Sequence, residues 1–206
     1  MYLVNGRKLD RLDELHNERA SRPAAVHFDI GAGDGSYALQ HARRHPGTAV
    51  VAVEPNHASL AEAARRAARD RSSANAWFVL GSLEALPGSF EGVASSVSIL
   101  FPWGSLLRAV AAPERDQLAR ISRLCAPGAR IEVVTAIEPA ADAGELRRLG
   151  LEGLSLEATA QGWCDAGFRD VALAALDNDH PYQTTWWRKI RQRNGRTAVL
   201  LSARAP

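Results

Sequence analysis

Cysteine is scarce in this chain, and long uninterrupted apolar segments are missing. Cys125 and Cys164 are its two cysteines among 206 residues. Neither has another cysteine or a histidine at metal-ligand spacing, so no zinc site or other metal site is expected around them. We expect both to be reduced, buried, structural thiols. Apolar stretches such as 49–53 and 97–101 are strand-sized, far below the ~20 residues that a membrane-spanning helix needs.

The start of the chain lacks the features of an exported protein. Its first residues, MYLVNGRKLD, contain no basic segment leading into an apolar stretch and no lipidation signal. We therefore expect a cytoplasmic protein with no membrane contact. A hydrophobic content of 46% and a charged content of 23% are ordinary for one globular domain, which we place at residues 1–206.

The positive charge is concentrated near the C-terminus. The formal net charge of the whole chain is only +2, and its last acidic residue is Asp179. The basic residues after that point are Arg188, Lys189, Arg191, Arg193, Arg196 and Arg204. Since no acidic side chain follows to neutralise them, we expect the segment 180–197 to face the phosphates of a nucleic acid.

Strand and helix signals alternate along most of the chain. Asn5-Gly6 predicts the tight turn of a small N-terminal β-hairpin at residues 1–10. The expected strands are 26–30, 50–53, 77–80, 97–100 and 130–135, and the expected helices run from 36 to before Pro46, at 58–69 and at 114–124. This alternation predicts a mostly parallel α/β sheet with helices on both faces.

The remaining third departs from this alternation. The expected elements there are a helix at 156–165, a strand at 171–175, a helix at 186–193 and a strand at 198–202. They predict a final strand that enters the sheet antiparallel to its neighbours.

A glycine-rich turn, DIGAGDG at 29–35, connects the first strand of the alternating part to its helix, where doubly wound sheets bind nucleotides. A dinucleotide fingerprint, G-x-G-x-x-G, would need glycine where Ser36 stands. The observed D-x-G-x-G-x-G, which begins at Asp29, is typical of methyltransferases. S-adenosylmethionine carries a sulfonium and an ammonium, and an acid before the first glycine suits these cations better than a pyrophosphate. The predicted cofactor is therefore S-adenosylmethionine, held at Asp29, Gly31, Gly33 and Gly35.

Two acidic residues follow the next strands. Glu54 ends the second strand, where a carboxylate accepts both ribose hydroxyl protons; the alternative is a solvated loop acid. Leu83-Glu84 follow the third strand and could supply a backbone group and a carboxylate to the edge of the cofactor's adenine. By themselves they are weak evidence. Asp34 lies within the glycine turn and can be explained simply as the N-cap of the helix that follows.

Tryptophans mark two candidate substrate segments. FPWGSLLR at 101–108 follows the fourth strand, at the edge of the sheet where the methyl group would be transferred. An aromatic face there can stack on a base, which is worth ~1–3 kcal/mol. TTWWRK at 184–189 lies in the most basic segment, and either Trp186 or Trp187 supplies a second face while the other packs on the sheet. A lone tryptophan usually belongs to the core, but the pair favours a clamp for a flipped base.

Together, DIGAGDG, FPWGSLLR and TTWWRK resemble the motifs of the aminoglycoside-resistance methyltransferases that modify N1 of adenine 1408 in 16S rRNA. The resemblance spans nearly the whole chain. It implies a seven-stranded, doubly wound, Rossmann-like class I S-adenosylmethionine-dependent methyltransferase fold with an N-terminal β-hairpin. It also implies methyl transfer to 16S rRNA within the 30S subunit, and we expect a monomer.

The same resemblance assigns roles by position. Trp103 and Trp186 would sandwich the target adenine, and the Pro102 carbonyl would accept a hydrogen bond from its N6 amino group. The implied cofactor contacts are Asp29, Gly31, Glu54, Pro55, Leu83, Glu84, Leu100, Ser105 and Thr184. The implied RNA contacts are Arg65, Arg66, Arg69 and Arg71 after the second strand, with Arg188, Lys189 and Arg196 near the C-terminus.

Some positions depart from the family pattern, and other interpretations stay open. Glu54 stands where some relatives have Asp, arginines replace lysines in the first basic cluster, and Asn194 stands where relatives can be basic. Without the resemblance, the first cluster reads as a solvated helix face. Alternative functions are methylation of a small metabolite or of another RNA adenine, and a non-catalytic binding module, which the intact glycine turn disfavours.

Overall fold

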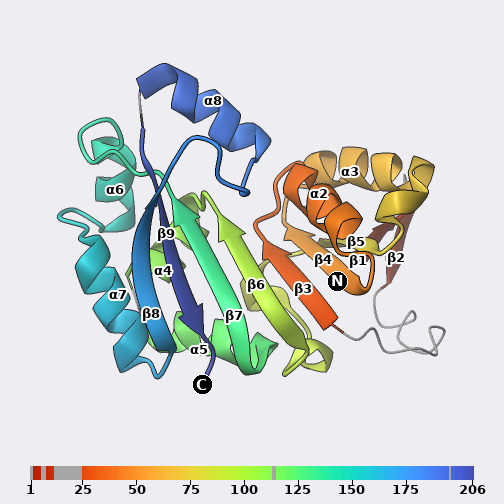
Figure 1. The fold of residues 1–206 in the computed structure, drawn as a ribbon, viewed down its shortest axis with the longest axis horizontal. Helices are drawn as coiled ribbons and strands as arrows, with labels where there is room; N and C mark the ends of the chain where they lie inside the picture. Colours follow the sequence, from red (N-terminus) through yellow and green to blue (C-terminus); the bar gives the residue numbers. More distant parts are fainter. Residues whose placement is uncertain (1, 6–7, 12–24, 113–114, 195) are drawn as a thin grey trace.

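A computed structural model describes residues 2–5, 8–11, 25–112, 115–194 and 196–206. Its strands form one nine-stranded sheet in the order β2-β1-β5-β4-β3-β6-β7-β9-β8 (Figure 1). The bounds are β1 Tyr2–Asn5, β2 Lys8–Arg11, β3 Ala25–Ile30, β4 Thr48–Glu54, β5 Ala76–Leu80, β6 Ala94–Leu100, β7 Cys125–Thr135, β8 Arg169–Leu176 and β9 Ala198–Arg204. Strands β3 to β7 pair in parallel, and β9 is antiparallel to both neighbours. Strands β3 to β9 form the expected seven-stranded fold with an antiparallel final strand, and β1 and β2 add two more strands at one edge.

Helices cover both faces of this sheet. They are α2 Ser36–Arg44, α3 His57–Arg69, α4 Gly104–Ala111, α5 Arg115–Leu124, α6 Ala143–Leu149, α7 Leu156–Asp165 and α8 Thr185–Asn194. Helix α2 packs against β4 and α3 against β5, while α5 packs against β7 and α7 against β8. In Figure 1, α8 lies at the end of the sheet toward which β6 and β7 point. Among the described residues, no helix has both the length and the apolar character to cross a membrane.

Alternate residues of β4 face the two helical layers. Val50 and Ala52 belong to a buried cluster with α2 and α3. Val51 and Val53 belong to the cluster that contains residues of α4, α5 and α7. Because side chains alternate across a strand, a strand buried on both faces is apolar at nearly every position. This explains why the run 49–53 is continuously apolar.

The expected N-terminal hairpin extends the sheet at one edge. β1 and β2 pair antiparallel with Asn5 opposite Lys8, and β1 also pairs antiparallel with β5. The second strand reaches Arg11, one residue beyond the expected end. The predicted turn at residues 6 and 7 lies outside the described residues.

One expectation about local structure was wrong, and two helices were not predicted. Cys125 is free and buried as expected, but Cys164 is free and exposed. Trp163 is the buried side chain of that part of α7, and the next helical position points about 100° away from it, toward solvent. The short helices α4 and α6 were not anticipated, because Pro102 and Gly104 gave the first segment the composition of a loop.

Candidate functional site

A cavity of about 680 Å³ opens at the carboxyl ends of the parallel strands. Its wall includes the ends of β3, β4 and β6, at Ile30, Glu54 and Leu100, and the segment that follows β5. Residues at the beginnings of α4 and α8 complete it. Parallel strands bring segments far apart in sequence to one edge, where open α/β sheets bind ligands.

Most of the predicted site residues line this cavity. From the cofactor set they are Asp29, Gly31, Gly33, Glu54, Pro55, Leu83, Glu84, Leu100, Ser105 and Thr184. From the substrate set they are Pro102, Trp103 and Trp186, and Lys189 joins them from the basic set. The fold therefore places the expected cofactor and substrate segments around one space.

The glycine turn needs its glycines for two different reasons. Gly31 has φ +74°, a backbone conformation that residues with a side chain rarely adopt, and a Cβ there would also lie 2.6 Å from Cδ2 of Leu106. Gly35, a predicted cofactor contact, is not among the residues that line the cavity. It is buried, and a Cβ on it would lie 2.6 Å from Cβ of Ala63. Gly35 therefore allows α2 to pack closely on α3, and its cofactor contact stays a prediction.

Asp29 is a buried carboxylate with one oxygen left over. Its side chain is 1% exposed, and Oδ1 accepts a hydrogen bond from the Ser98 hydroxyl at 2.9 Å. Oδ2 has no hydrogen-bond partner among the described residues. Burial raises the pKa of Asp29 to about 7, the Ser98 hydrogen bond opposes this rise, and Glu54 and Asp34 add to it. A buried, unpaired carboxylate oxygen beside a cavity suits a cationic ligand.

Glu54 is not a free loop acid. Oε2 accepts a hydrogen bond from the Gly33 amide at 3.0 Å, and Oε1 accepts one from the Asn56 amide at 2.9 Å. Each carboxylate oxygen has a second acceptor site. Glu54 can therefore hold the glycine turn and still accept hydrogen bonds from a vicinal diol in the cavity.

Asp34 connects the glycine turn to α8. Its Oδ1 accepts from the Ser36 amide at 3.1 Å. The N-cap residue of α2 is Gly35, so the N-cap alternative for Asp34 was wrong. Burial acts to raise the pKa of Asp34, but hydrogen bonds to the Thr185 side chain and Ser36 hold it below its usual value. The backbone carbonyl of Asp34 accepts a hydrogen bond from Arg66 at 2.7 Å. The turn, α3 and the beginning of α8 are thus tied to one residue.

The structure distinguishes the two neighbouring tryptophans of α8. Trp187 is 1% exposed and stacks on Phe101 with ring centroids 5.3 Å apart and planes at 7°. Trp186 and Trp103 line the cavity yet are 48% and 45% exposed. Phe101 has φ +50°, a strained conformation for a residue other than glycine, and it directly precedes Pro102 and Trp103. The backbone strain lies where an aromatic residue is presented to the cavity.

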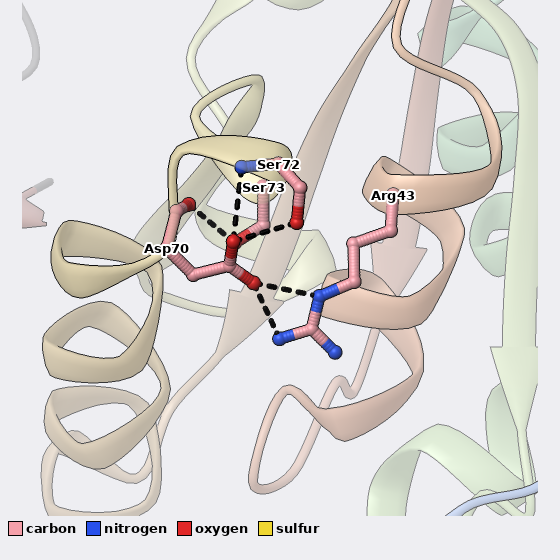
Figure 2. A network of polar contacts seen from close by, with 4 residues as sticks. All are labelled: Arg43, Asp70, Ser72 and Ser73. Atoms are coloured by element: carbon pink, nitrogen blue, oxygen red, sulfur yellow. Dashed lines mark hydrogen bonds and ion pairs between the residues drawn. The ribbon is translucent and has the colours of Figure 1, made fainter.

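The basic residues predicted to contact RNA are not equally available. Arg69, Arg71, Arg188 and Lys189 are exposed. Between the first two, Asp70 accepts hydrogen bonds from the Ser72 amide and hydroxyl and pairs with Arg43 of α2 at 2.7 Å (Figure 2). The Ser72 bonds, followed by Arg43, lower the pKa of Asp70 to about 2. Asp70, the acid within this basic cluster, is therefore bound to Ser72 and Arg43, and these bonds fix the turn that carries Arg71.

Arg196, a predicted docking residue, is bound within the chain. Its guanidinium donates to both carboxylate oxygens of Asp142, at 2.5 and 2.7 Å, and to the Ala136 carbonyl at 2.8 Å. The two charged side chains are only 10% and 7% exposed. Arg196 thus holds the segment after β7 to the start of β9, and it is not free to contact phosphate.

Two arginines of α3 also have partners within the chain. Arg66 is half-buried and bound to the Asp34 carbonyl. Arg65 pairs with Glu62, one turn earlier on the same helix. The first basic cluster is therefore partly structural, and its outward charge lies mainly on Arg69 and Arg71.

Several residues of the cavity wall were not predicted. They are Ile30, Ala32, Asp34, Val53, Asn56, Ser59, Gly81, Ser82, Phe101, Leu106 and Thr185. Gly81 and Ser82 directly follow β5, so the rule that ligands bind beyond the carboxyl ends of strands would have found them. Ser59 and Leu106 lie on helices, and only the packing of those helices brings them to the cavity.

Comparison with known proteins found matches over nearly the whole chain. The family model described as NpmA: 16S rRNA (adenine(1408)-N(1))-methyltransferase matches residues 2–205. A 16S rRNA (adenine(1408)-N(1))-methyltransferase of Escherichia coli is 31% identical over 202 residues, covering 92% of each chain.

Solved structures give the same result. The crystal structure of the aminoglycoside resistance methyltransferase NpmB1 has a TM-score of 0.79 at 30% identity, covering 100% of this chain and 99% of that one. A 16S rRNA (adenine(1408)-N(1))-methyltransferase from Catenulisporales acidiphilia, a tryptophan-to-alanine mutant with cosubstrate SAM, has a TM-score of 0.83 at 30% identity. That match covers 100% of this chain and 96% of the other.

Proposed function

Because this chain belongs to the NpmA family of 16S rRNA (adenine(1408)-N(1))-methyltransferases, we propose that its cavity binds S-adenosylmethionine on the β3–β4 side and the target adenine between Trp103 and Trp186. The enzyme methylates N1 of adenine 1408 with S-adenosylmethionine as donor, and the product confers aminoglycoside resistance. The observation that carries the proposed site is the pair of half-exposed tryptophans on the wall of the cavity that also contains Asp29.

The proposed cofactor site fits the chemistry of the donor set. S-adenosylmethionine supplies a methyl group on a positively charged sulfur. Oδ2 of Asp29, buried and without a partner among the described residues, accepts a hydrogen bond from the ammonium of the methionine part. Glu54 accepts from the ribose hydroxyls, and Leu83 and Glu84 border the adenine.

The proposed substrate side works by positioning. N1 of adenine has an in-plane lone pair at neutral pH, so no general base is needed to create the nucleophile. The rings of Trp103 and Trp186 hold the flipped base on its two faces, with stacking worth ~1–3 kcal/mol per base. The Pro102 carbonyl accepts from N6, which selects adenine and orients N1. Holding two reactants in line can account for several kcal/mol of catalysis.

Docking on RNA is assigned to the exposed cations. Arg69 and Arg71 beside α3, and Arg188 and Lys189 on α8, form the proposed phosphate-binding surface, which we call the docking surface. In this proposal a monomer, a single domain formed by residues 1–206, binds 16S rRNA within the 30S subunit in the cytoplasm. Counterion release from such contacts makes binding strongly salt-dependent.

Primer extension tests this proposal. Intact 30S subunits and protein-free 16S rRNA are incubated with the enzyme and S-adenosylmethionine, and reverse transcription is then carried across the decoding region. A methyl on N1 blocks Watson–Crick pairing, so we expect a stop at adenine 1408 in the 30S sample that is much weaker in free RNA. Equal modification of both RNAs would contradict the 30S subunit as substrate, and methylation of free adenosine at a similar rate would favour a small-molecule enzyme.

A further inference from the structure

A buried chain of hydrogen bonds leads from the interior of the sheet to Asp29. The hydroxyl of Ser96 lies 2.8 Å from Nδ1 of His27, and Nε2 of His27 lies 3.0 Å from Oγ of Ser98. Ser98 in turn donates to Oδ1 of Asp29 at 2.9 Å. His27, Asp29 and Ser98 are 2%, 1% and 0% exposed. All four side chains come from the neighbouring strands β3 and β6, which pair in parallel.

The direction of these hydrogen bonds follows from their chemistry. An ionised carboxylate only accepts, so the single proton of the Ser98 hydroxyl points to Asp29. Oγ of Ser98 must then accept from Nε2–H of His27. In a neutral imidazole the other nitrogen is an acceptor, so the Ser96 hydroxyl donates to Nδ1. Each donor therefore points toward Asp29.

We propose that Ser98 and His27 are positioning residues for the cofactor: they orient the Asp29 carboxylate and stabilise its charged form, leaving Oδ2 for the ammonium of the methionine part. This inference rests on the proposed role of Asp29. Neither residue lines the cavity, so neither touches the ligand, and their effect passes through Asp29.

The surroundings favour this arrangement. His27 stacks on His41 with ring centroids 3.9 Å apart and planes at 14°, and His41 lies next to His45. Burial first, then His41, His45 and Arg130, keep the pKa of His27 well below its usual value. The ring is therefore neutral and can take the tautomer that donates from Nε2.

Asp29 faces other acidic groups. Glu54 and Asp34 repel its charge, and Asp29 in turn acts to raise the pKa of the Tyr37 hydroxyl. Burial, Glu54 and Asp34 raise the pKa of Asp29, whereas the Ser98 hydrogen bond lowers it. Removing that hydrogen bond shifts Asp29 toward its neutral form, which cannot pair with an ammonium.

The test measures how tightly S-adenosylhomocysteine binds between pH 6 and pH 9, by calorimetry, in the wild type and in Ser98→Ala. This ligand has the amino group of the methionine part and is chemically stable over that range. Because that amine itself loses its proton near pH 9, the variant is compared with the wild type at each pH. Because only the ionised carboxylate binds, wild-type affinity should rise about tenfold from pH 6 to pH 8. Ser98→Ala should bind about tenfold more weakly at pH 7 and recover to within about threefold of the wild type at pH 9.

Matched controls separate positioning from general damage. 5′-Methylthioadenosine has the same thioether but no amino-acid part, so Ser98→Ala should leave its affinity unchanged. Ser95→Ala removes a hydroxyl of the same strand that, among the described residues, bonds only to the backbone of Val26, and it should bind both ligands like the wild type. In the Asp29→Asn background, adding Ser98→Ala should cause no further loss.

Each outcome has a distinct meaning. If Ser98→Ala weakens the binding of both ligands equally at every pH, or still lowers affinity in the Asp29→Asn background, the positioning role is wrong. If Asp29→Asn binds S-adenosylhomocysteine like the wild type, the proposed role of Asp29 itself fails. Nitrogen-15 NMR of the imidazole of His27 in the unmodified protein does not depend on the folding of any variant. An Nε2–H tautomer supports the chain, and an Nδ1–H tautomer or an imidazolium overturns it.

Discussion

The two sides of the cavity are built in opposite ways. On the β3–β4 side, Asp29 and Glu54 accept hydrogen bonds from within the chain, and the buried Oδ2 of Asp29 has no partner in the described part of the chain. On the α4–α8 side, Trp103 and Trp186 leave nearly half of their surfaces exposed. In the proposed function, this difference means that a small charged ligand meets a prebuilt site, whereas the RNA side is completed only when a base enters it.

The largest effect is expected from the exposed side. Trp103→Ala or Trp186→Ala should lower the methylation rate on 30S subunits by about 1,000-fold, because each removes one face of the base clamp. The affinity for S-adenosylhomocysteine should change by less than about threefold, since neither ring is buried in the core. Initial rates and calorimetry measure the two quantities. A parallel loss of both would show that the two sides are not separable.

The second test uses an arginine that the sequence assigned to RNA and the structure assigns to the fold. Arg196→Ala leaves Asp142 buried without its partner, and breaking such a pair costs about 3 kcal/mol. Thermal and denaturant unfolding should show this loss. Lys189→Gln is the control, because Lys189 is exposed: its stability should be unchanged, while the salt slope of 30S binding falls by about one. If Arg196→Ala kept full stability and lost 30S affinity, the docking role would be restored.

The smallest effects should distinguish two neighbouring arginines of α3. Arg69→Gln removes an exposed charge and should weaken 30S binding a few-fold, with about one unit less salt slope. Arg66→Gln also removes the hydrogen bond to the Asp34 carbonyl. It should therefore weaken the binding of S-adenosylhomocysteine about threefold as well. Filter binding at several salt concentrations and calorimetry measure these effects. Identical behaviour of the two variants would mean that the Asp34 contact does not support the cofactor side.

Local sequence features predicted the elements that lie in the sheet well. The apolar run at 49–53 predicted β4 because both of its faces are buried, and DIGAGDG predicted a turn that requires positive φ at Gly31. Helix α4 escaped prediction because Pro102 and Gly104 give its start the composition of a loop. Cys164 was misplaced because a helical position next to Trp163 can point outward, and its residue type does not show which side it takes.

The sequence by itself determined the α/β alternation, the family, the glycine turn and the two tryptophan segments, because strand period, backbone φ and local motifs depend on neighbours in the chain. Only the tertiary structure decided which of Trp186 and Trp187 faces the cavity, that Gly35 serves helix packing, and that Arg196 is paired. Those outcomes depend on contacts across the fold, such as that between Arg196 and Asp142, which are 54 positions apart. Whether a charge or a ring is available to a ligand depends on what else is packed against it.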